Sequence, residues 1–400
     1  MFWTALLGSL ALLSLFITVW QWLAARRFPL HQRVADQSFT PAVTLPKPLK
    51  GCDSETAQCL RSWLTQDYPG DVQILFGVAS PDDPVCAIVR QLIDEHPTRD
   101  AQLVVCGESL GVNAKVSTLI QLERLARHGY MVVSDADVRV PPDLLRNLIA
   151  PLRPSEVGLV NCFYRLANPS TLGMHWEAIA INADFWSQVL QSRTLKPLDF
   201  ALGAVMAVKR EALEKVGGFA SLADHLADDY LLGNKIARAG WRIDLCPVVA
   251  ECWESPRTWR EVWRHQLRWA RTIRVCQPLP YFFSILSNAT LWPLVWLSMD
   301  LPTILFKSEV PWIGSAGFAL SIPLPRSASF FAFCLLVRLL TALNNQGRLT
   351  QSTGHRDFFW LVPVKDLLQA ALWLLAFTGN HIEWRAQRFR LRSDGKLVKD

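Results

Sequence analysis

Two aspartates one residue apart, Asp135 and Asp137, follow the apolar run YMVV after a single serine. Two carboxylates this close repel each other, and both lose hydration if the run before them is a buried strand. A divalent cation would relieve the repulsion, because Mg²⁺ or Mn²⁺ binds carboxylate oxygens together with the phosphate oxygens of a substrate. The pair alone is a weak signal for a metal site, since Asp-x-Asp arises by chance in many chains.

Two further acidic pairs lie near the ends of predicted elements. Asp82 and Asp83 follow the apolar run VQILFGV, and Asp228 and Asp229 open a helical pattern. Each pair also has a purely structural interpretation, because an acid before Pro84 can cap a helix and acids in a first helical turn favour the helix dipole. The combination is more specific. Ligands of an α/β sheet bind outside the carboxyl ends of its strands, so acids that end successive strands converge on one crevice.

The basic run WRHQLRWARTIR supplies the cations that such a crevice needs. The guanidinium of Arg268 suits a diphosphate, because it pairs bidentately with phosphate oxygens. The same run could instead be a basic amphipathic helix at a membrane surface. A metal-bridged diphosphate is a leaving group, and a separate carboxylate could take the proton from an attacking hydroxyl. These parts together predict sugar transfer from a nucleotide-sugar.

The elements that must position these side chains alternate between strand and helix over residues 40–277. Strands are predicted at AVTLPKPL, VQILFGV, QLVVC, YMVVSD, VGLVNCF and AVMAV. Helices are predicted at SETAQCLRSWL, DPVCAIVRQLIDEH, NAKVSTLIQLERLARH and PPDLLRNLIAPL. This alternation predicts an α/β domain with a mostly parallel sheet and flanking helices. The common dinucleotide and P-loop sites lose support, because the chain contains neither GxGxxG nor GxxxxGKS.

An uncharged apolar segment at residues 2–25 is long enough to cross a bilayer. Arg26 and Arg27 follow at once, which predicts an anchor over residues 1–27 whose C-terminal end faces the cytoplasm. A signal peptide is disfavoured, because no basic region precedes the run and no A-x-A cleavage pattern follows it.

The region 278–380 is apolar again and is predicted to contain membrane-embedded or interfacial helices. Its segments are PYFFSILSNATLWPLVWLSMDLPTILF, then FFAFCLLVRLLTAL preceded by WIGSAGFALSIPL, then FFWLVPVKDLLQAALWLLAF. The last carries Lys365 and Asp366. Arg348 and Arg356 before it and the basic stretch after it all favour the cytoplasm, which predicts an interfacial helix or a re-entrant hairpin instead of a single crossing. The sequence leaves the number of crossings open.

The remaining features narrow the class of protein. Residues 381–400 form a basic stretch, predicted to be a cytosolic tail that faces anionic lipid. The nine cysteines are odd in number and form no CxxC pair, which argues against a disulfide framework or a zinc site. No basic-aromatic module for nucleic acid is present. We therefore expect an integral membrane protein with its catalytic domain in the cytoplasm, at the inner or cell membrane if the source is bacterial.

The same motifs, in the same order, resemble those of the ceramide glucosyltransferase family, a group of inverting glycosyltransferases with the GT-A fold. The match runs through PKPLKGCD, QDYPGDVQILFGVASPDDP, LGVNAKV, VVSDADVRV, LGAVMAVKREALEKVGGF, ADDYLLGNKIARAGWRIDL and HQLRWAR, over about residues 42–275. Within the family, RHQLRWARTIR looks closest to a bacterial branch associated with hopanoid lipids. The resemblance implies a GT-A nucleotide-diphospho-sugar transferase domain between N-terminal and C-terminal transmembrane helices.

The resemblance also implies catalytic roles. Asp229 matches the catalytic base, and Asp228 stands beside it where the family has glutamate. Arg268 and Trp269 match the last two positions of the family's (Q/R)xxRW motif. The first position of that motif is His265 here, which departs from the family, and either neighbour of His265 in the sequence could take its role.

Donor and metal binding follow from the same resemblance. The residues that match donor-binding positions are Lys50, Asp83, Asn113, Lys115 and Asp135. Asp135 and Asp137 would hold Mg²⁺ or Mn²⁺. Asp137 stands where animal glucosylceramide synthases often have glycine, which brings this chain closer to the general Asp-x-Asp form.

The predicted activity is transfer of a hexose, glucose or N-acetylglucosamine, from a UDP-sugar to a hydroxyl of a membrane lipid, a ceramide or a hopanoid. Two alternatives remain: a processive polysaccharide synthase of the same superfamily and a non-catalytic membrane scaffold. The few, broken apolar segments disfavour the channel that a processive synthase needs. The presence of Asp83, Asp135 and Asp229 disfavours a degenerate scaffold.

Overall fold

The computed structural model describes residues 2–307, 326–384 and 387–399. Its main strands are Val43–Leu49 (β1), Val72–Val78 (β2), Asp100–Val105 (β3), Tyr130–Ser134 (β4), Val138–Arg139 (β5), Val157–Leu166 (β6), Val205–Lys209 (β7) and Arg242–Cys252 (β8). They form one sheet in the order β3-β2-β1-β4-β7-β6-β8-β5. β1, β2, β3 and β4 run parallel, as do β6 and β8, whereas β7 and β5 are antiparallel to their neighbours. The predicted α/β sheet is confirmed.

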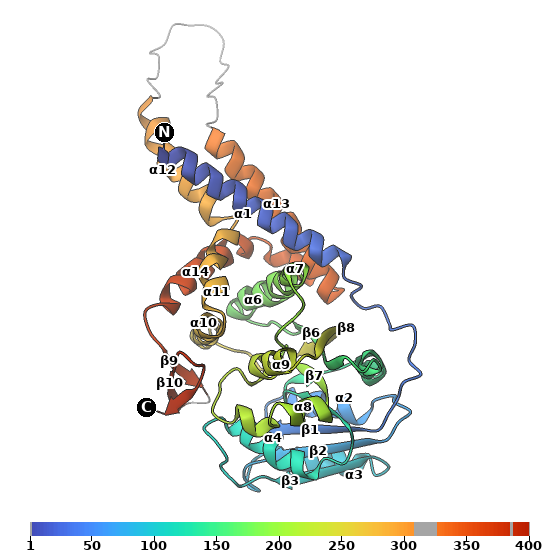
Figure 1. The fold of residues 1–400 in the computed structure, drawn as a ribbon. Coiled ribbons are helices and arrows are strands. Elements are labelled where there is room, and N and C mark those ends of the chain that lie inside the picture. Colours follow the sequence, from blue (N-terminus) through green and yellow to red (C-terminus); the bar gives the residue numbers. More distant parts are fainter. Residues whose placement is uncertain (1, 308–325, 385–386, 400) are drawn as a thin grey trace.

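Helices cover both faces of the sheet (Figure 1). One core contains buried residues of α2 (Thr56–Leu64), α3 (Val85–Glu95) and α5 (Leu144–Ile149). The other core contains residues of α4 (Ala114–Leu125), α7 (Trp186–Leu195), α8 (Arg210–Lys215) and α9 (Asp228–Arg238). The predicted helices correspond to α2, α3, α4 and α5, and the predicted strands to β1, β2, β3, β4, β6 and β7. β8 was not predicted, because its run RIDLCPVVAEC mixes charged and apolar residues.

Strand β1 contains two prolines and a lysine in the run VTLPKPL. Proline has no N–H to give to a sheet ladder. The β1–β4 ladder accordingly runs over Val43 and Thr44, before the prolines, whereas the β1–β2 ladder runs along the whole strand. Lys47, between the two prolines, is 1% exposed, and its side chain reaches toward the end of β4.

Three long apolar helices lie side by side at one end of the molecule (Figure 1): α1 (Phe2–Arg27), α12 (Leu291–Lys307) and α13 (Arg326–Thr350). Among the described residues, α1 and α13 are each long and apolar enough to cross a membrane. Residues Pro278–Ser287 and Leu291–Asp300, bent by 53°, add a third crossing if they count as one span. The predicted segment WIGSAGFALSIPL lies outside the described residues.

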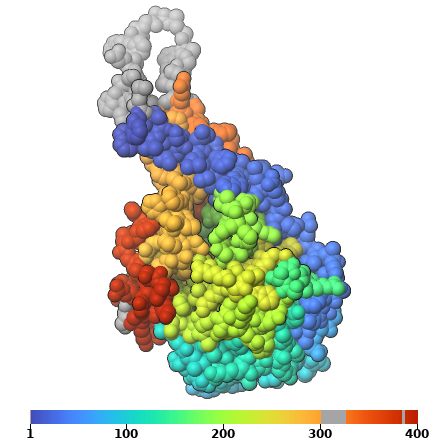
Figure 2. Space-filling model, viewed as in Figure 1, coloured from blue at the N-terminus to red at the C-terminus, as the bar shows by residue number. Residues whose placement is uncertain are grey.

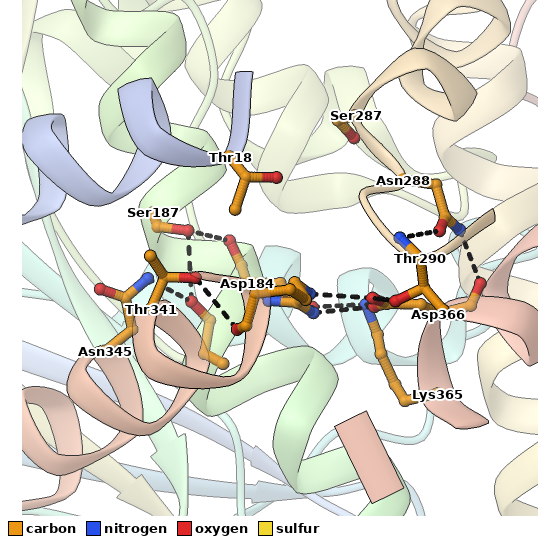
Figure 3. Close-up of polar contacts among 12 residues, drawn as sticks. Thr18, Asp184, Ser187, Ser287, Asn288, Thr290, Thr341, Asn345, Lys365 and Asp366 are labelled. Carbon is orange, nitrogen blue, oxygen red and sulfur yellow. Dashed lines mark hydrogen bonds and ion pairs between the residues drawn. The ribbon is translucent and has the colours of Figure 1, made fainter. Parts of the chain in front are cut away.

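The charged residues of the last apolar segment point into the protein. Lys365 and Asp366 lie on α14 (Leu361–Ala376) and are only 5% and 3% exposed. Asp184 accepts from Arg338 of α13 at 2.9 and 3.0 Å and also pairs with Lys365. Asp366 accepts from the same Arg338 at 2.8 and 2.9 Å and from Thr290 at 2.7 Å (Figure 3). We call Asp184, Arg338, Lys365 and Asp366 the buried ion cluster.

The buried ion cluster joins the helices to the sheet domain. Asp184 lies in the π-helical turn Ala180–Phe185 between α6 (Leu172–Ile179) and α7, and its two partners come from α13 and α14. Two acids face two cations, so the cluster is electrically balanced and the charges of α14 do not meet lipid. The placement of that segment as an interfacial helix or a re-entrant hairpin stays a prediction.

The basic stretch at residues 381–400 does not form the predicted tail over its described residues. It folds into a three-stranded antiparallel sheet of β9 (His381–Trp384), β10 (Gln387–Leu391) and β11 (Leu397–Lys399). Ile382, Phe389, Leu391 and Leu397 bury their side chains on one face of this sheet. Alternation of apolar and basic residues in QRFRL, which looks like a solvated charge run, is the pattern of a half-buried strand. Figure 2 shows this small sheet against the side of the main domain.

Candidate active site

Acidic and basic side chains from three segments meet where β4 ends. The ammonium of Lys115, in the first turn of α4, lies 2.8 Å from Oδ1 of Asp135 and 3.1 Å from Oδ2 of Asp228. Burial disfavours the charged form of Lys115, but Asp135 and Asp228 outweigh it and raise the pKa of the ammonium. Lys115 therefore links Asp135, just after β4, to Asp228, the first residue of α9.

Asp229 lies beside this group, on the first turn of α9. Burial, and then the neighbouring charge of Asp228, raise the pKa of Asp229 to about 6. Its Oδ1 accepts a hydrogen bond from the backbone N–H of Tyr230 at 2.7 Å. A Cβ at Gly203 would lie 2.5 Å from Oδ2 of Asp229, so the carboxylate packs where only glycine leaves room. A carboxylate with a pKa near 6 is suited to accept a proton near neutral pH.

The predicted repulsion between Asp135 and Asp137 is present. Burial, and then the charge of Asp135, raise the pKa of Asp137 to about 6. The ammonium of Lys47 donates to the backbone oxygen of Asp135 at 2.6 Å and to Oγ of Ser134 at 3.2 Å. Burial lowers the pKa of Lys47 to about 8, although Asp135 and Asp137 act against this. Lys47 thus holds the backbone of the acidic turn, by which we mean residues 135–137.

The acidic turn fits a divalent cation that shares its ligands with a substrate. Within the described part of the chain, no group of three or more His, Cys, Asp and Glu side chains is arranged as a metal site. Mg²⁺ does not need such a group, because it is usually bound by one or two carboxylates plus substrate phosphates and water. The raised pKa of Asp137 shows that negative charge is costly here, and a cation would relieve that cost.

Asp83 lies at the same edge of the sheet, after β2. Both of its oxygens accept from the N–H of Gly51 at 3.0 Å, and Oδ1 also accepts from the N–H of Val85 at 3.0 Å. Gly51 has a φ of 66°, a conformation that favours glycine. Asp83 therefore fixes the turn after β1, the strand between β2 and β4. Lys50, next to Gly51, is exposed at this edge.

Asn113 caps α4 instead of presenting its side chain to the crevice. Its Oδ1 accepts from the N–H of Val116 at 3.2 Å, and its Nδ2 donates to the backbone oxygen of His225 at 2.8 Å. The residue is fully buried. Asn113 thus positions Lys115, two residues later, and its predicted contact with a donor stays a prediction.

The helix that carries Arg268 and Trp269 is α10 (Trp259–Cys276), which begins with a capping box formed by Thr258 and Glu261. Arg268 and Trp269 are partly buried. The ring of Trp269 lies 6.3 Å from that of Phe185, which in turn lies 5.6 Å from that of Tyr164.

Tyr164 of β6 lies at the other end of this aromatic row. Burial raises the pKa of the Tyr164 phenol well above its usual value, and the charges of Asp229 and Asp135 act in the same direction. The row Tyr164–Phe185–Trp269 therefore joins β6 to α10. The structure joins Asp135 and Asp228 through Lys115, with Asp229 next to Asp228 in the chain. The roles of Arg268 and Trp269 at this site stay predictions.

A buried glutamate that sequence reasoning missed holds the start of α10. Glu177 on α6 is fully buried, and its Oε1 lies 2.6 Å from Nδ1 of His265 and accepts from Nε2 of Gln266 at 2.8 Å. Arg257, just before α10, pairs with the other oxygen. Of the two neighbours considered for the first motif position, Gln266 thus shares the partner of His265. Arg264 instead pairs at 3.2 Å with Glu383 of β9, at the surface.

Two residues that support the site, Lys47 and Glu177, could have been noticed in the sequence. Lys47 is a lone cation inside an apolar strand pattern, and Glu177 is a lone acid in the apolar stretch LGMHWEAIAI. Charged residues are almost never fully buried unless paired. Each of these isolated charges predicts a partner of opposite charge or a hydrogen-bond partner, but only the fold identifies it.

Comparisons with known proteins identify the family of the chain. Residues 6–397 match the model of glycosyl transferase family 21. The chain belongs to glycosyl transferase family 21. It is 25% identical to ceramide glucosyltransferase 3 of Caenorhabditis elegans over 98% of this chain and 82% of that protein. It is also 33% identical to the ceramide glucosyltransferase of Candida albicans, over 29% of this chain and 24% of that protein.

Two further relatives extend the picture. The family 21 chain is 27% identical to a beta-monoglucosyldiacylglycerol synthase of Synechocystis, over 58% of this chain and 47% of that one. A mannosyltransferase from Pyrobaculum calidifontis, solved in complex with GDP-Man and Mn²⁺, has a similar structure, with a TM-score of 0.53 and 20% identity over 93% of this chain and 97% of that one. The likeness confirms a GT-A-like fold. None of these relatives tests the hopanoid branch.

Proposed function

We propose that this family 21 glycosyltransferase transfers a hexose from a UDP-sugar to a hydroxyl of a membrane lipid, with inversion at the anomeric carbon. The observation that carries the proposal is the meeting of Asp135, Lys115 and Asp228 next to Asp229 at one edge of the sheet. Glucose and N-acetylglucosamine remain the two sugars considered. The ceramide glucosyltransferases among the relatives support a ceramide acceptor, whereas a hopanoid acceptor rests on the motif RHQLRWARTIR.

The donor would lie along the edge where β1, β2 and β4 end. Its nucleotide would lie near Asp83 and Lys50, and its diphosphate near Asp135 and Lys115. Asp135 and Asp137 would hold Mg²⁺ or Mn²⁺, which when bound neutralises charge on the diphosphate. Asn113 would support this arrangement through the cap that it gives to α4.

Asp229 would act as the general base. Its carboxylate takes the proton of the lipid hydroxyl while that oxygen attacks the anomeric carbon from the face opposite the diphosphate. The bond between the anomeric carbon and the diphosphate oxygen breaks in the same step, and UDP leaves with the electron pair. Arg268 donates to the departing diphosphate, and Trp269 forms a wall of the acceptor channel. Asp228 holds Lys115 and, through its charge, keeps the pKa of Asp229 high.

The membrane helices would bring this site to its acceptor. The second end of α1, with Arg26 and Arg27, adjoins the main domain, and cations favour the cytoplasmic side. We therefore place the domain in the cytoplasm, where a lipid head group reaches the site without leaving the bilayer.

The test incubates the purified protein with UDP-glucose or UDP-N-acetylglucosamine and vesicles that contain a ceramide, a hopanoid polyol or a diacylglycerol. Mass analysis of the organic extract identifies the glycolipid, and NMR of the product gives the anomeric configuration. One inverted monoglycosylated lipid is the expected result. A long water-soluble polymer would support the processive synthase instead. If the protein neither bound a donor nor transferred a sugar under any combination, the result would support the non-catalytic scaffold.

A further inference from the structure

The three-stranded sheet β9–β11, which we call the C-terminal clamp, contacts the loop that leads into the acids. The N–H of Leu397 donates to the backbone oxygen of Asp224 at 2.7 Å, and the N–H of Leu226 donates to the backbone oxygen of Gly395 at 3.5 Å. Leu226 packs into the apolar face of the clamp with Leu397 and Phe389. Two residues after Leu226, α9 begins with the two aspartates of the site.

The other side of the same loop is held by the segment that leads into α4. Oδ1 of Asp224 accepts from the N–H of Val112 at 3.1 Å, and the backbone oxygen of Ala223 accepts from the N–H of Asn113 at 2.8 Å. Val112 also packs against the apolar face of the clamp. Residues 223–227 therefore lie between the clamp and the segment before Lys115.

The clamp also contacts the end of α10. Arg271 donates to the backbone oxygen of His381, and Arg274 donates to the side chain of Asn380, just before β9. Val275 packs against the apolar face of the clamp. One small sheet thus contacts the entry to α9, the entry to α4 and the last turns of α10.

We propose that the C-terminal clamp is a positioning element for transfer, and that Leu397 is its central positioning residue. It holds Asp229, Lys115 and Arg268 in one geometry, although their three helices lie far apart in the sequence. The inference rests on the proposed function, since it concerns the same site. It predicts that loosening the clamp slows the chemical step more than it weakens donor binding, because Asp83, Asp135 and Asp137 lie outside the segments that the clamp contacts.

The test compares two adjacent residues of β11 in the full chain. Leu397 is 3% exposed in the apolar face, whereas Val398 is 43% exposed on the opposite face. Leu397→Ser should lower kcat at least about tenfold, because small displacements of catalytic groups are costly. The dissociation constant of UDP should rise by a clearly smaller factor than kcat falls, whereas a general loss of folding would change both alike. Val398→Ser should leave both quantities unchanged, and Leu397→Met should restore kcat.

A second, milder variant covers the case in which Leu397→Ser does not fold. Gly395 has a φ of 82°, so Gly395→Ala strains the turn before β11 and keeps the apolar face intact. It should lower kcat and speed hydrogen exchange at residues 223–229. Equal kcat in Leu397→Ser, Gly395→Ala and Val398→Ser, or a parallel fall in kcat and UDP binding, would overturn the proposal. Absence of transfer by the unaltered protein would overturn the proposed function instead, and hydrogen exchange would then decide on the clamp.

Discussion

The acids at the edge of the sheet and the buried ion cluster use the same residue types in opposite ways. In the cluster, Asp184 and Asp366 face Arg338 and Lys365, and every charge has an opposite partner within reach. At the sheet edge, Asp135 and Asp228 share the ammonium of Lys115, Lys47 lies beside Asp135, and the pKa values of Asp137 and Asp229 are raised. Buried carboxylates whose pKa values are raised by a neighbouring carboxylate are typical of sites that bind a cation or accept a proton.

The largest expected effect concerns Asp229→Asn. Loss of the general base should lower kcat about 10²- to 10⁴-fold. The midpoint of thermal unfolding in detergent should stay the same or rise, because the substitution removes an unbalanced buried charge. A steady-state assay of lipid glycosylation and a melting curve measure the two effects. Full activity in this variant would remove Asp229 from the mechanism.

The opposite outcome is expected for Asp184→Asn. Removing one charge from a balanced buried cluster leaves Arg338 and Lys365 short of a partner, at a cost of about 3–5 kcal/mol of folding free energy. The unfolding midpoint should fall sharply, and the kcat of the protein that remains folded should stay near that of the unaltered chain. A variant that melts normally but loses kcat would break the comparison between the two regions.

A smaller effect is expected for Glu177→Gln. The substitution keeps the shape and one acceptor but removes the charge that His265 and Arg257 face. Because α10 carries Arg268 and Trp269, kcat should fall about tenfold, as expected for a slight displacement of groups near the reaction. Glu383→Gln is the matched control, since Glu383 pairs with Arg264 of the same helix at the surface. A similar loss in both variants would argue against a special role for Glu177.

The pH dependence gives the finest test. Asp229 accepts a proton only when ionised, and its pKa is raised to about 6. The kcat should therefore rise with pH, reach half of its maximum near pH 6 and level off at higher pH. Asp228→Asn removes one cause of the raised pKa, so the acid limb of the profile should move to lower pH, though not fully, because burial is the larger cause. An acid limb that stays in place would point to a different titrating group.

The sequence predicts most of the sheet because its strands are short continuous apolar runs bounded by turns. It fails at β8, where charged residues at the strand ends disguise the pattern. The prediction from sequence also fails at residues 381–400. Arginines that alternate with Phe389 and Leu391 look like a charged tail when the apolar surface that covers these two side chains is not known. That surface is formed by Leu226 and Val112, which lie far away in the sequence.

Within the site, the resemblance identifies the acids and Lys115, and the fold brings them together. Sequence reasoning could not predict that the side chain of Asn113 both caps α4 and donates a hydrogen bond to the backbone oxygen of His225. Nor could it see that His265 and Gln266 share one buried carboxylate. The contact of Asn113 with His225 and the contacts of His265 and Gln266 with Glu177 each join residues more than 80 positions apart in the chain.

The contact between Leu397 and Asp224 also bears on how the protein is made. Strand β11 follows α1, α12, α13 and α14 in the order of synthesis, whereas the loop that it binds precedes three of these helices. The ribosome therefore releases the loop before Asp228 long before its β-strand partner exists. We expect a nascent chain to gain transferase activity only after its apolar helices have been delivered to the bilayer, which would keep half-made molecules from consuming nucleotide-sugar away from their lipid.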